Sequence, residues 1–539
     1  MKSSTNPLAD KLLSRTPAIT NKPAAQLAII AGVSGLIYMV IFTLRFPLAT
    51  FYTTIPPIDY TKLTNYSPGG LMIYVIGIGL LFGLYLYGVR LAAPAGDESD
   101  KPISGSIVFL GSAVLAASSI FAYPLSAIDL FIYAIRTRGW ALYGLNPLAT
   151  APEQLPASDP WLNLAGEWID AASPYGPIWE LLSRGAFTLS GGGFLAHLLG
   201  LKLLAVLAYL GCVWLVYDTL QQLRPEWATA GTLAFAWSPL TLLESVQNGH
   251  NDIVMTLFLL AAVWVFVGWQ LRGRRTQTMH PAAIRWLTPG LAPLLICILL
   301  ALSILIKFVT IITLPFFLLG LVSRQEDLIR RLASMAGYGL LMALLVALPL
   351  LPFWPGLENW AVLQAGDQAG RSLLALLILG LSDPLGLNTA FDLSRNLILG
   401  LFGLIYLYLL WRTVARLRHI SSRPQAERPG LAALLPISPS FFVLFWYVLL
   451  AAPVFHAWYL LWFLPLAALL LPDRRPLSGA VVFSVTALLL IPYFETIRVW
   501  YPALLRNQFI GHLVGVPLLI LPPALALLWP ISPGKKSEV

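Results

Sequence analysis

The sequence has few charged residues for its length, and this scarcity excludes an ordinary soluble protein. Only 11% of the 539 residues are charged, whereas 58% are hydrophobic and the mean hydropathy is +0.76. About a quarter of the residues of a typical soluble domain are charged. Repeated apolar runs of about 20 residues instead predict an all-α, polytopic membrane protein. The polar–apolar alternation of a membrane β-barrel is absent from the sequence.

Cysteines and nucleotide-binding motifs are also scarce. The two cysteines, Cys212 and Cys297, both fall inside apolar segments, which indicates core residues rather than a disulfide framework. The sequence has no Walker loop, no Gly-x-Gly-x-x-Gly, no His-Glu-x-x-His and no Gly-x-Ser-x-Gly, so a soluble nucleotide site is not expected. The net charge of +9 comes from basic residues dispersed in short loops, which favours the positive-inside rule over nucleic-acid binding.

The apolar runs predict about fourteen membrane spans, with both termini in the cytoplasm. We expect a cytoplasmic tail at 1–25, a membrane domain at 26–530 and a second tail at 531–539. The predicted spans are 26–45, 71–91, 104–122, 198–217, 229–243, 253–270, 290–306, 308–322, 333–351, 395–411, 432–452, 458–472, 477–493 and 510–530. This topology leaves most Lys and Arg residues on the inner side, including those of 272–275, 330–331, 412–428 and 474–475.

One apolar stretch, residues 289–322, is far longer than a single span requires. As one helix it would reverse every later loop and expose the arginines of 412–428 outside. We therefore predict a tight hairpin with Lys307 near the outer surface. Its short arms, and the short span 229–243 containing Pro239, are typical of helices that line a protein-enclosed cavity.

The long polar segment 124–197 follows the third span on the predicted outer side. Asp129 lies near its start among apolar residues, where partial desolvation would suit a general base. A helix cap at the membrane interface explains it equally well. The Trp and Tyr residues of this segment fit either a shelf for sugar rings or an aromatic belt.

Three further places concentrate polar groups on the predicted outer side. The loop 244–252 holds two acids, three Asn or Gln residues and His250, with a turn signal at Asn248-Gly249. Asp252 fits a helix cap as well as a functional role. Lys307 is a cation within an apolar run, which marks either a functional site or a snorkelling side chain. His456 opens the span 458–472. A single His among scattered carboxylates is weak evidence for a metal site.

These stretches resemble the GT-C superfamily of membrane glycosyltransferases, and most closely the bacterial polyprenol-phosphate-mannose-dependent alpha-1,6-mannosyltransferases. The matching pieces are Asp129, Asn146-Pro147, Ser173-Pro174-Tyr175-Gly176-Pro177, Asn248-Gly249-His250-Asn251-Asp252, Lys307 to Pro315, and Trp458-Tyr459-Leu460-Leu461-Trp462. They keep this order over most of the chain. No second acid adjoins Asp129, unlike the paired acids of several metal-dependent relatives, so we expect no divalent metal and no other cofactor.

The resemblance implies transfer of a hexose, mannose by analogy, from a polyprenyl-phosphate donor to a glycan or lipid-linked acceptor at the extracytoplasmic face of the plasma membrane. Asp129 would act as general base in an inverting displacement, and cations such as Lys307 would hold the departing phosphate. The other outward cations that could meet a phosphate are Arg371, Arg395, Arg498 and Arg506. The candidate substrate-binding residues are Tyr133, Asn146, Tyr175, Glu244, Asn248, His250, Asn251, Asp252, Lys307, His456 and Trp458.

Two other classes of membrane protein are compatible with the composition. A transporter or lipid flippase would carry inverted repeats and polar groups near the bilayer midplane, but no repeat is visible here and the polar groups lie toward one side. A polymerase or ligase of envelope polysaccharide shares the outward chemistry and the lipid-phosphate substrate.

Overall fold

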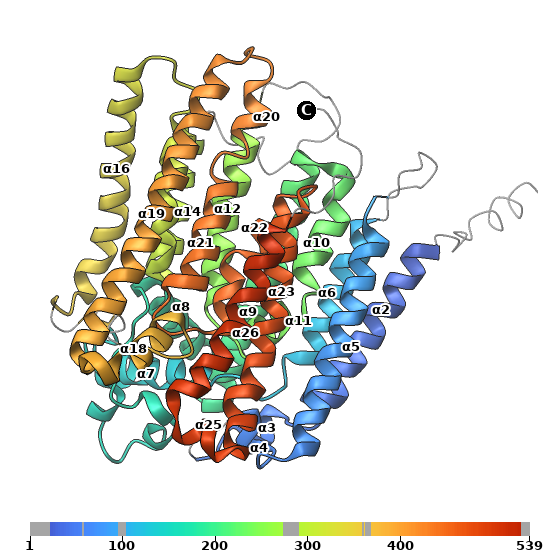
Figure 1. Cartoon of the computed structure of the whole chain (residues 1–539), viewed down its shortest axis with the longest axis vertical. Coiled ribbons are helices and arrows are strands. Elements are labelled where there is room, and N and C mark those ends of the chain that lie inside the picture. Colours follow the sequence, from blue (N-terminus) through green and yellow to red (C-terminus); the bar gives the residue numbers. More distant parts are fainter. Residues whose placement is uncertain are drawn as a thin grey trace, which may run out of the picture.

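A computed structural model describes residues 22–55, 59–94, 104–272, 290–357, 360–361 and 368–529. Over these residues the chain is helical, and its extended pairings are the isolated bridges Pro47–Ala122 and Gly370–Val454 (Figure 1). The predicted all-α membrane bundle is confirmed. The tail 531–539, most of the tail 1–25, and most of the predicted loop 272–275 lie outside the described residues.

The helices fall into three groups. The long ones are α2 (Lys22–Tyr38), α5 (Pro68–Ala92), α9 (Phe194–Leu223), α12 (Asp252–Leu271), α16 (Leu328–Leu350), α19 (Leu387–Ser422), α21 (Ile437–Trp446, continued by η10 at Tyr447–Ala451), α23 (Arg474–Pro492) and α26 (Gln508–Leu528). The shorter apolar ones are α6 (Gly105–Ser119), α10 (Ala228–Ala236), α14 (Ala292–Ile306), α15 (Leu314–Leu321), α18 (Leu373–Leu385) and α22 (Leu464–Leu469). The segment between α6 and α9 forms α7 (Asp129–Tyr143) and α8 (Pro177–Leu189).

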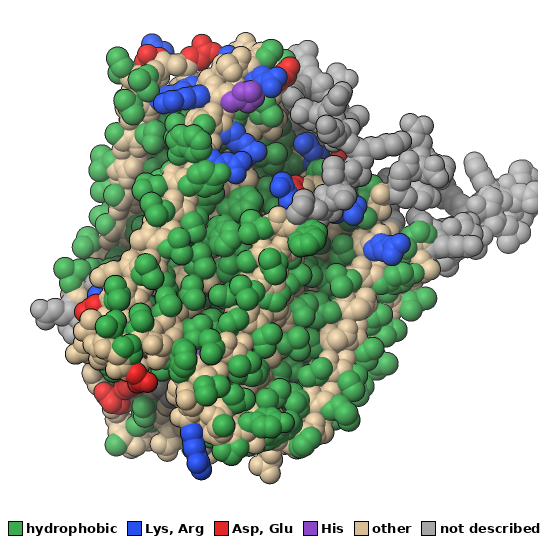
Figure 2. Space-filling view, in the orientation of Figure 1, with side chains coloured by type: hydrophobic (Ala, Val, Ile, Leu, Met, Phe, Trp, Pro, Cys, Tyr) green, Lys and Arg blue, Asp and Glu red, His purple; other side chains and the backbone are tan. Residues whose placement is uncertain are grey.

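Nine helical segments of the described chain are long and apolar enough to cross a membrane, and five apolar helices are shorter. The α12 segment is 83% buried over its most apolar window, whereas the corresponding windows of α16 and α19 are 11% and 17% buried. Therefore α12 runs through the middle of the bundle and α16 and α19 lie at its edge. The exposed side chains of the bundle's middle are mostly hydrophobic (Figure 2), as lipid contact requires.

The chain reverses direction at Lys307, as the hairpin prediction requires. The Lys307 Nζ lies 2.8 Å from the Asp252 carboxylate at the beginning of α12. The Gln270 amide, near the other end of α12, donates to the Gly320 carbonyl at 3.3 Å. Residues 308–320 therefore return along α12, partly as a 3₁₀ helix over Phe308–Thr313.

The segments predicted to face the cytoplasm gather at one end of the bundle. Arg331 donates to Ser421 at 2.8 Å, which joins the start of α16 to the end of α19, and Arg428 pairs with Glu326 at 2.8 Å. Figure 2 shows Lys and Arg side chains concentrated toward this end. The structure contains no membrane, so the orientation N-in and C-in stays a prediction.

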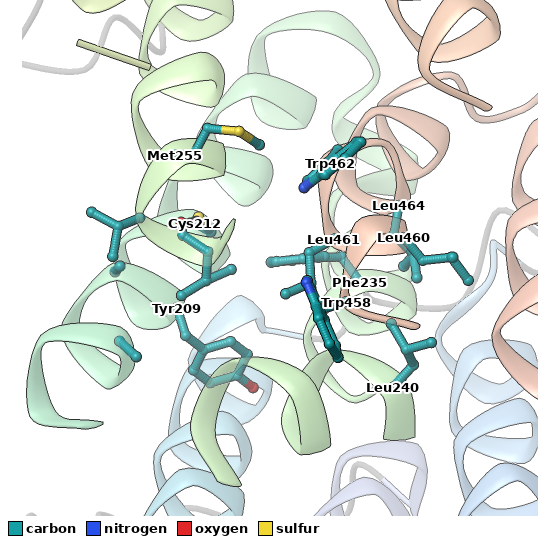
Figure 3. Packing of buried hydrophobic residues seen from close by; sticks show 14 of the residues in the cluster. Tyr209, Cys212, Phe235, Leu240, Met255, Trp458, Leu460, Leu461, Trp462 and Leu464 are labelled. Atoms are coloured by element: carbon teal, nitrogen blue, oxygen red, sulfur yellow. Dashed lines mark hydrogen bonds between the residues drawn. The ribbon is translucent and has the colours of Figure 1, made fainter. Parts of the chain in front are cut away.

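Aromatic and aliphatic side chains fill the middle of the bundle around α12 (Figure 3). Trp462, from the 3₁₀ segment η11 (Ala457–Trp462), is 2% exposed there, and Met255 of α12 is fully buried. Cys212 and Cys297 are free and buried, as predicted.

Helix α18 corrects the sequence prediction, which assigned 352–394 to an outer loop. Ser372 caps the helix by accepting a hydrogen bond from the Ala375 amide at 3.2 Å. Its 13 residues include Asp383 and Pro384, so the segment falls short of the about 20 apolar residues that identify a span.

Candidate active site

A broken helix carries the polar loop 244–252 into the protein. Helix α10 ends at Ala236, Pro239 begins the short α11 (Pro239–Thr241), and a π-helical turn follows at Leu242–Gln247. Gly249 then adopts a φ of +75°, which favours glycine and confirms the predicted turn. Proline and the π turn thus explain why 229–243 is too short to span a membrane.

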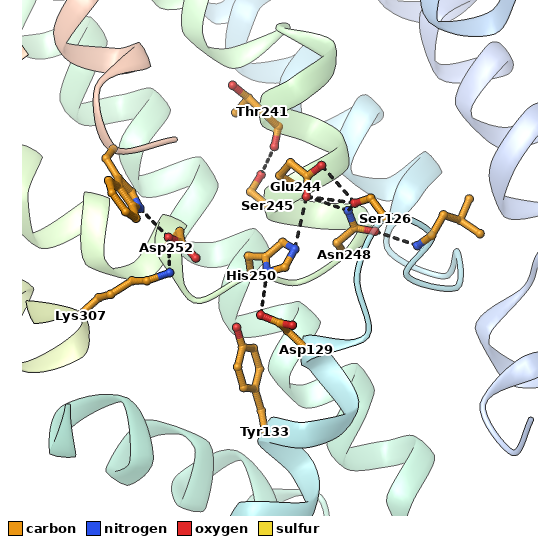
Figure 4. Close-up of polar contacts among 12 residues, drawn as sticks. Ser126, Asp129, Tyr133, Thr241, Glu244, Ser245, Asn248, His250, Asp252 and Lys307 are labelled. Atoms are coloured by element: carbon orange, nitrogen blue, oxygen red, sulfur yellow. Dashed lines mark hydrogen bonds and ion pairs between the residues drawn. The ribbon is translucent and has the colours of Figure 1, made fainter. Parts of the chain in front are cut away.

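Asp129 is the first residue of α7 and points toward this loop (Figure 4). Its Oδ2 lies 3.7 Å from the His250 Nδ1 and accepts a hydrogen bond of 3.3 Å from the Tyr175 hydroxyl. Tyr133 donates in turn to Tyr175 at 3.4 Å. The Asp129 side chain is 10% exposed, so it is mostly buried but still accessible to solvent.

His250 connects Asp129 to a second carboxylate. Its Nε2 lies 3.3 Å from Glu244 Oε2, and both side chains have no exposed surface. Glu244 also accepts hydrogen bonds from Ser126 at 3.1 Å and from Asn248 at 2.9 Å. Asn248 in turn accepts from the Leu125 amide at 2.9 Å, so this network fixes the backbone just before Asp129.

Aromatic stacking holds two histidines on opposite faces of one indole. The ring centroids of His250 and Trp458 are 4.0 Å apart, and those of Trp458 and His456 are 4.2 Å apart. Burial lowers the pKa of His456 well below its ordinary value, and the charges of Arg371 and Lys307 lower it further. His456 is therefore neutral at physiological pH and is a hydrogen-bonding group rather than a cation.

Lys307 is enclosed by an acid and three aromatic rings. Asp252 is its ion-pair partner, and this carboxylate also accepts from the Trp462 indole. The Lys307 ammonium lies 5.6, 5.0 and 5.4 Å from the ring centroids of Tyr175, Tyr459 and Trp462. The N-cap residue of α12 is Asn251, and Asp252 instead forms an ion pair with Lys307.

The Pro-Gly turn at 173–177 fixes Tyr175 between Asp129 and Lys307. The Gly176 amide donates to the Ile306 carbonyl at 3.0 Å. A Cβ atom on Gly176 would lie 1.9 Å from the Leu305 carbonyl oxygen. The turn can therefore pack on the hairpin only with glycine at this position.

Arg371 brings a second cation to the same region. With Ser126, His456 and Trp458 it lines a cavity of about 20 Å³, which has room for about one water. Its guanidinium pairs with Glu495, and its backbone φ of +53° is unusual for a residue other than glycine. A sugar can enter only if these side chains move apart.

Several polar atoms of the site are buried without a hydrogen bond in the described structure. They are both ring nitrogens of His250, both amide atoms of Asn251, and Asp252 Oδ2. A buried polar group without a hydrogen bond costs about 1–3 kcal/mol of stability. Native proteins therefore rarely keep several such groups together unless they serve a function. The Asn251 amide can donate to and accept from a ligand hydroxyl group, and Asp252 Oδ2 can accept a hydrogen bond from one.

The structure brings together ten of the eleven predicted substrate-binding residues with Asp129, and it separates one. Asn146 lies beyond the far end of α7, roughly 20 Å along the helix from Asp129. Its side chain bonds the Phe353 carbonyl and the Leu148 amide. The sequence interpretation did not single out Tyr459 and Trp462, whose rings face the Lys307 ammonium.

A further buried carboxyl group near the site is that of Glu180 in α8. It is 2% exposed and accepts a hydrogen bond of 2.6 Å from Ser173. Burial raises its pKa to about 7, against the lowering effects of Ser173 and Arg136. The folded protein therefore binds this proton more tightly than the unfolded chain, and the contribution to stability is lost as the pH rises through about 7.

We expect the purified protein to unfold at a lower temperature at about pH 8 than at about pH 5. Ionisation of Glu180 over this range should lower the free energy of unfolding by at most about 3 kcal/mol. Glu180→Gln keeps the Ser173 contact without a titrating group and should flatten this dependence, whereas the exposed Glu153→Gln should not. An equal slope in wild type and Glu180→Gln would exclude Glu180 as its source.

Within the described residues, no three His, Cys, Asp or Glu side chains are grouped so that they could hold a metal ion.

The sequence is similar to that of a known protein family. Residues 28–323 match the family model described as "Alpha-(1->6)-mannopyranosyltransferase, N-terminal domain". No curated protein matches the sequence.

Two solved membrane proteins show weak structural similarity. The archaeal oligosaccharyltransferase AglB from Archaeoglobus fulgidus, in complex with an inhibitory peptide and a dolichol-phosphate, has 14% identity over 78% of this chain, with a TM-score of 0.39. ArnT from Cupriavidus metallidurans, bound to undecaprenyl phosphate, has 15% identity over 78% of this chain and 76% of its own, with a TM-score of 0.37. The present chain spans 56% of the AglB chain.

Proposed function

Because the chain belongs to the alpha-(1->6)-mannopyranosyltransferase family, it is a membrane glycosyltransferase, and we propose that it transfers mannose from a polyprenyl-phosphate donor to a glycan or lipid-linked acceptor. The proposed site faces the extracytoplasmic side of the plasma membrane. The family match makes a transporter or flippase the weaker interpretation. A polysaccharide polymerase or ligase has no specific observation in its favour.

One observation carries the proposal: Asp129 meets buried polar groups from distant parts of the chain, some of which make no hydrogen bond in the described structure. His250 and Asn251 come from the loop after the broken helix, and Tyr175 comes from the Pro-Gly turn. All of them lie within the part of the chain that matches the family. Arg371, His456 and Trp458 are added from outside that part.

The proposed reaction is a single displacement with inversion. Asp129 accepts the proton of an acceptor hydroxyl, whose oxygen forms a bond to the anomeric carbon while the bond to the phosphate oxygen breaks. The electron pair leaves with the polyprenyl phosphate, whose charge is met by Arg371 and Lys307. His250, whose Nε2 lies against Glu244, orients Asp129 through its Nδ1. We propose that no divalent metal is needed, because two cations flank the site.

The proposal is tested by giving the purified protein different donors. We expect sugar transfer with polyprenyl-phosphate mannose, none above background with GDP-mannose, and slower transfer with polyprenyl-phosphate glucose. The chelator EDTA should leave the rate unchanged. Turnover with GDP-mannose alone would overturn the lipid donor, and loss of activity in EDTA with recovery on adding Mn²⁺ would overturn the metal-independent step.

A further inference from the structure

A large groove lies at the arginine-rich end of the bundle, where the proposed function needs nothing. Its volume is about 820 Å³, and it is formed by the second half of α19, by α21, by the start of α23 and by the end of α26. Its walls include Phe442, Trp446 and Leu527. Pockets for organic ligands have volumes of about 300–1,000 Å³, so the groove has the right size for part of a lipid.

Arginines form the polar rim of the groove. Arg412 and Arg416 are exposed on one face of α19, one turn apart, and Arg475 adds a third cation. Arg475 pairs with Asp473 at 2.8 Å. No acidic side chain of the described residues pairs with Arg412 or Arg416, and two like charges at this spacing repel each other. An anion between them would remove this repulsion.

The groove is far from the candidate active site. Arg475 lies in the first turn of α23, and Glu495, which pairs with Arg371, lies in the continuation of the same helical segment at its other end. Twenty residues of helix correspond to about 30 Å, which is the thickness of the hydrocarbon core of a bilayer. The two sites therefore belong to opposite leaflets.

We propose that this groove binds an anionic phospholipid of the leaflet opposite to the active site. The phosphate lies between Arg412 and Arg416, and an acyl chain lies on Phe442, Trp446 and Leu527. The groove is open to the membrane, because Tyr408 and Trp411 at its edge are 52% and 64% exposed. The charges select an anionic head group and the apolar walls select a lipid over a free phosphate.

The test titrates phosphatidylglycerol into the purified full-length protein in neutral detergent and follows the unfolding temperature. We expect phosphatidylglycerol to stabilise the wild type and phosphatidylcholine to have a much smaller effect. The variant R412Q/R416Q should bind phosphatidylglycerol about tenfold more weakly. R412K/R416K, which keeps both charges, should retain the preference. R330Q, which removes an exposed arginine at the same end outside the groove, should behave as the wild type.

Equal stabilisation of the wild type and R412Q/R416Q by phosphatidylglycerol would overturn the proposal. Stabilisation by inorganic phosphate as large as by phosphatidylglycerol would show a site for free phosphate and would also overturn it. The same holds if undecaprenyl phosphate stabilises the protein and phosphatidylglycerol does not. A lipid-free unfolding temperature of R412Q/R416Q equal to that of the wild type shows that its weaker response reports lost binding and not misfolding.

Discussion

Asp129→Asn is expected to lower kcat about a thousandfold while the KM for the lipid donor changes little. Asparagine has the same shape and can still accept the Tyr175 hydrogen bond, so the fold and the 3.3 Å contact should survive. It cannot take a proton from the acceptor hydroxyl. The measurement is initial velocity with saturating polyprenyl-phosphate mannose, compared with single-turnover rates to separate chemistry from product release.

The matched control is Asp170→Asn, which removes an exposed carboxylate from the same segment. It should leave kcat within about twofold, because surface substitutions seldom disturb a distant site. A turnover of Asp129→Asn within a few-fold of the wild type would rule out the general-base role. A loss of the folded protein would instead show as a lower unfolding temperature, which the control does not share.

Lys307→Met is expected to destabilise the protein by about 3–5 kcal/mol, because it leaves the Asp252 carboxylate buried without its partner. Asp252 has no exposed side-chain surface and Lys307 has 15%, so water cannot replace the lost contact. Methionine fills much of the same volume and keeps the contact with Tyr459 and Trp462. Chemical unfolding of the detergent-solubilised protein measures the change.

The double variant Lys307→Met/Asp252→Asn separates structure from function. Because asparagine is neutral and can still accept from the Trp462 indole, it should regain most of the lost stability. If Lys307 also helps to neutralise the departing phosphate, transfer activity should stay low in this stable variant. Full recovery of activity together with stability would show that Lys307 only pairs with Asp252 and that Arg371 meets the phosphate alone.

Much of the fold follows from hydropathy. Each predicted span coincides with helical structure, and the requirement that the arginines share one side of the membrane predicts the hairpin at Lys307. The family match confirms the resemblance drawn from the same residues. Hydropathy does not predict helix α18, because its 13 residues are fewer than the about 20 apolar residues that a helix needs to cross the membrane by itself.

The candidate site was predictable in its members and not in its contacts. The density of polar residues in 244–252 and the isolated Asp129 mark unusual positions in an apolar chain. The sequence gives no means to pair Lys307 with Asp252, since 55 residues separate them and the pairing depends on how α12 packs against the hairpin. The same packing turns Tyr459 and Trp462 inward, where a local pattern indicates only an interface belt.

Asn146 shows the opposite failure. Its Asn-Pro pair belongs to the motif set of the resemblance, yet its side chain stabilises a turn against the Phe353 carbonyl. In a single sequence, the polar Asn146 before Pro147 fits either a turn or a ligand-binding site, because Asn-Pro is also a common turn signal.

The proposed reaction requires one solvated cavity in which the lipid phosphate, the sugar and Asp129 meet. A cryo-EM structure of the full-length protein with bound polyprenyl phosphate tests this directly. We expect density for the lipid phosphate between Arg371 and Lys307 beside His456, with Asp129 still in contact with His250. Phosphate bound at the opposite end of the bundle, or a lipid whose head group lies remote from Asp129, would contradict it.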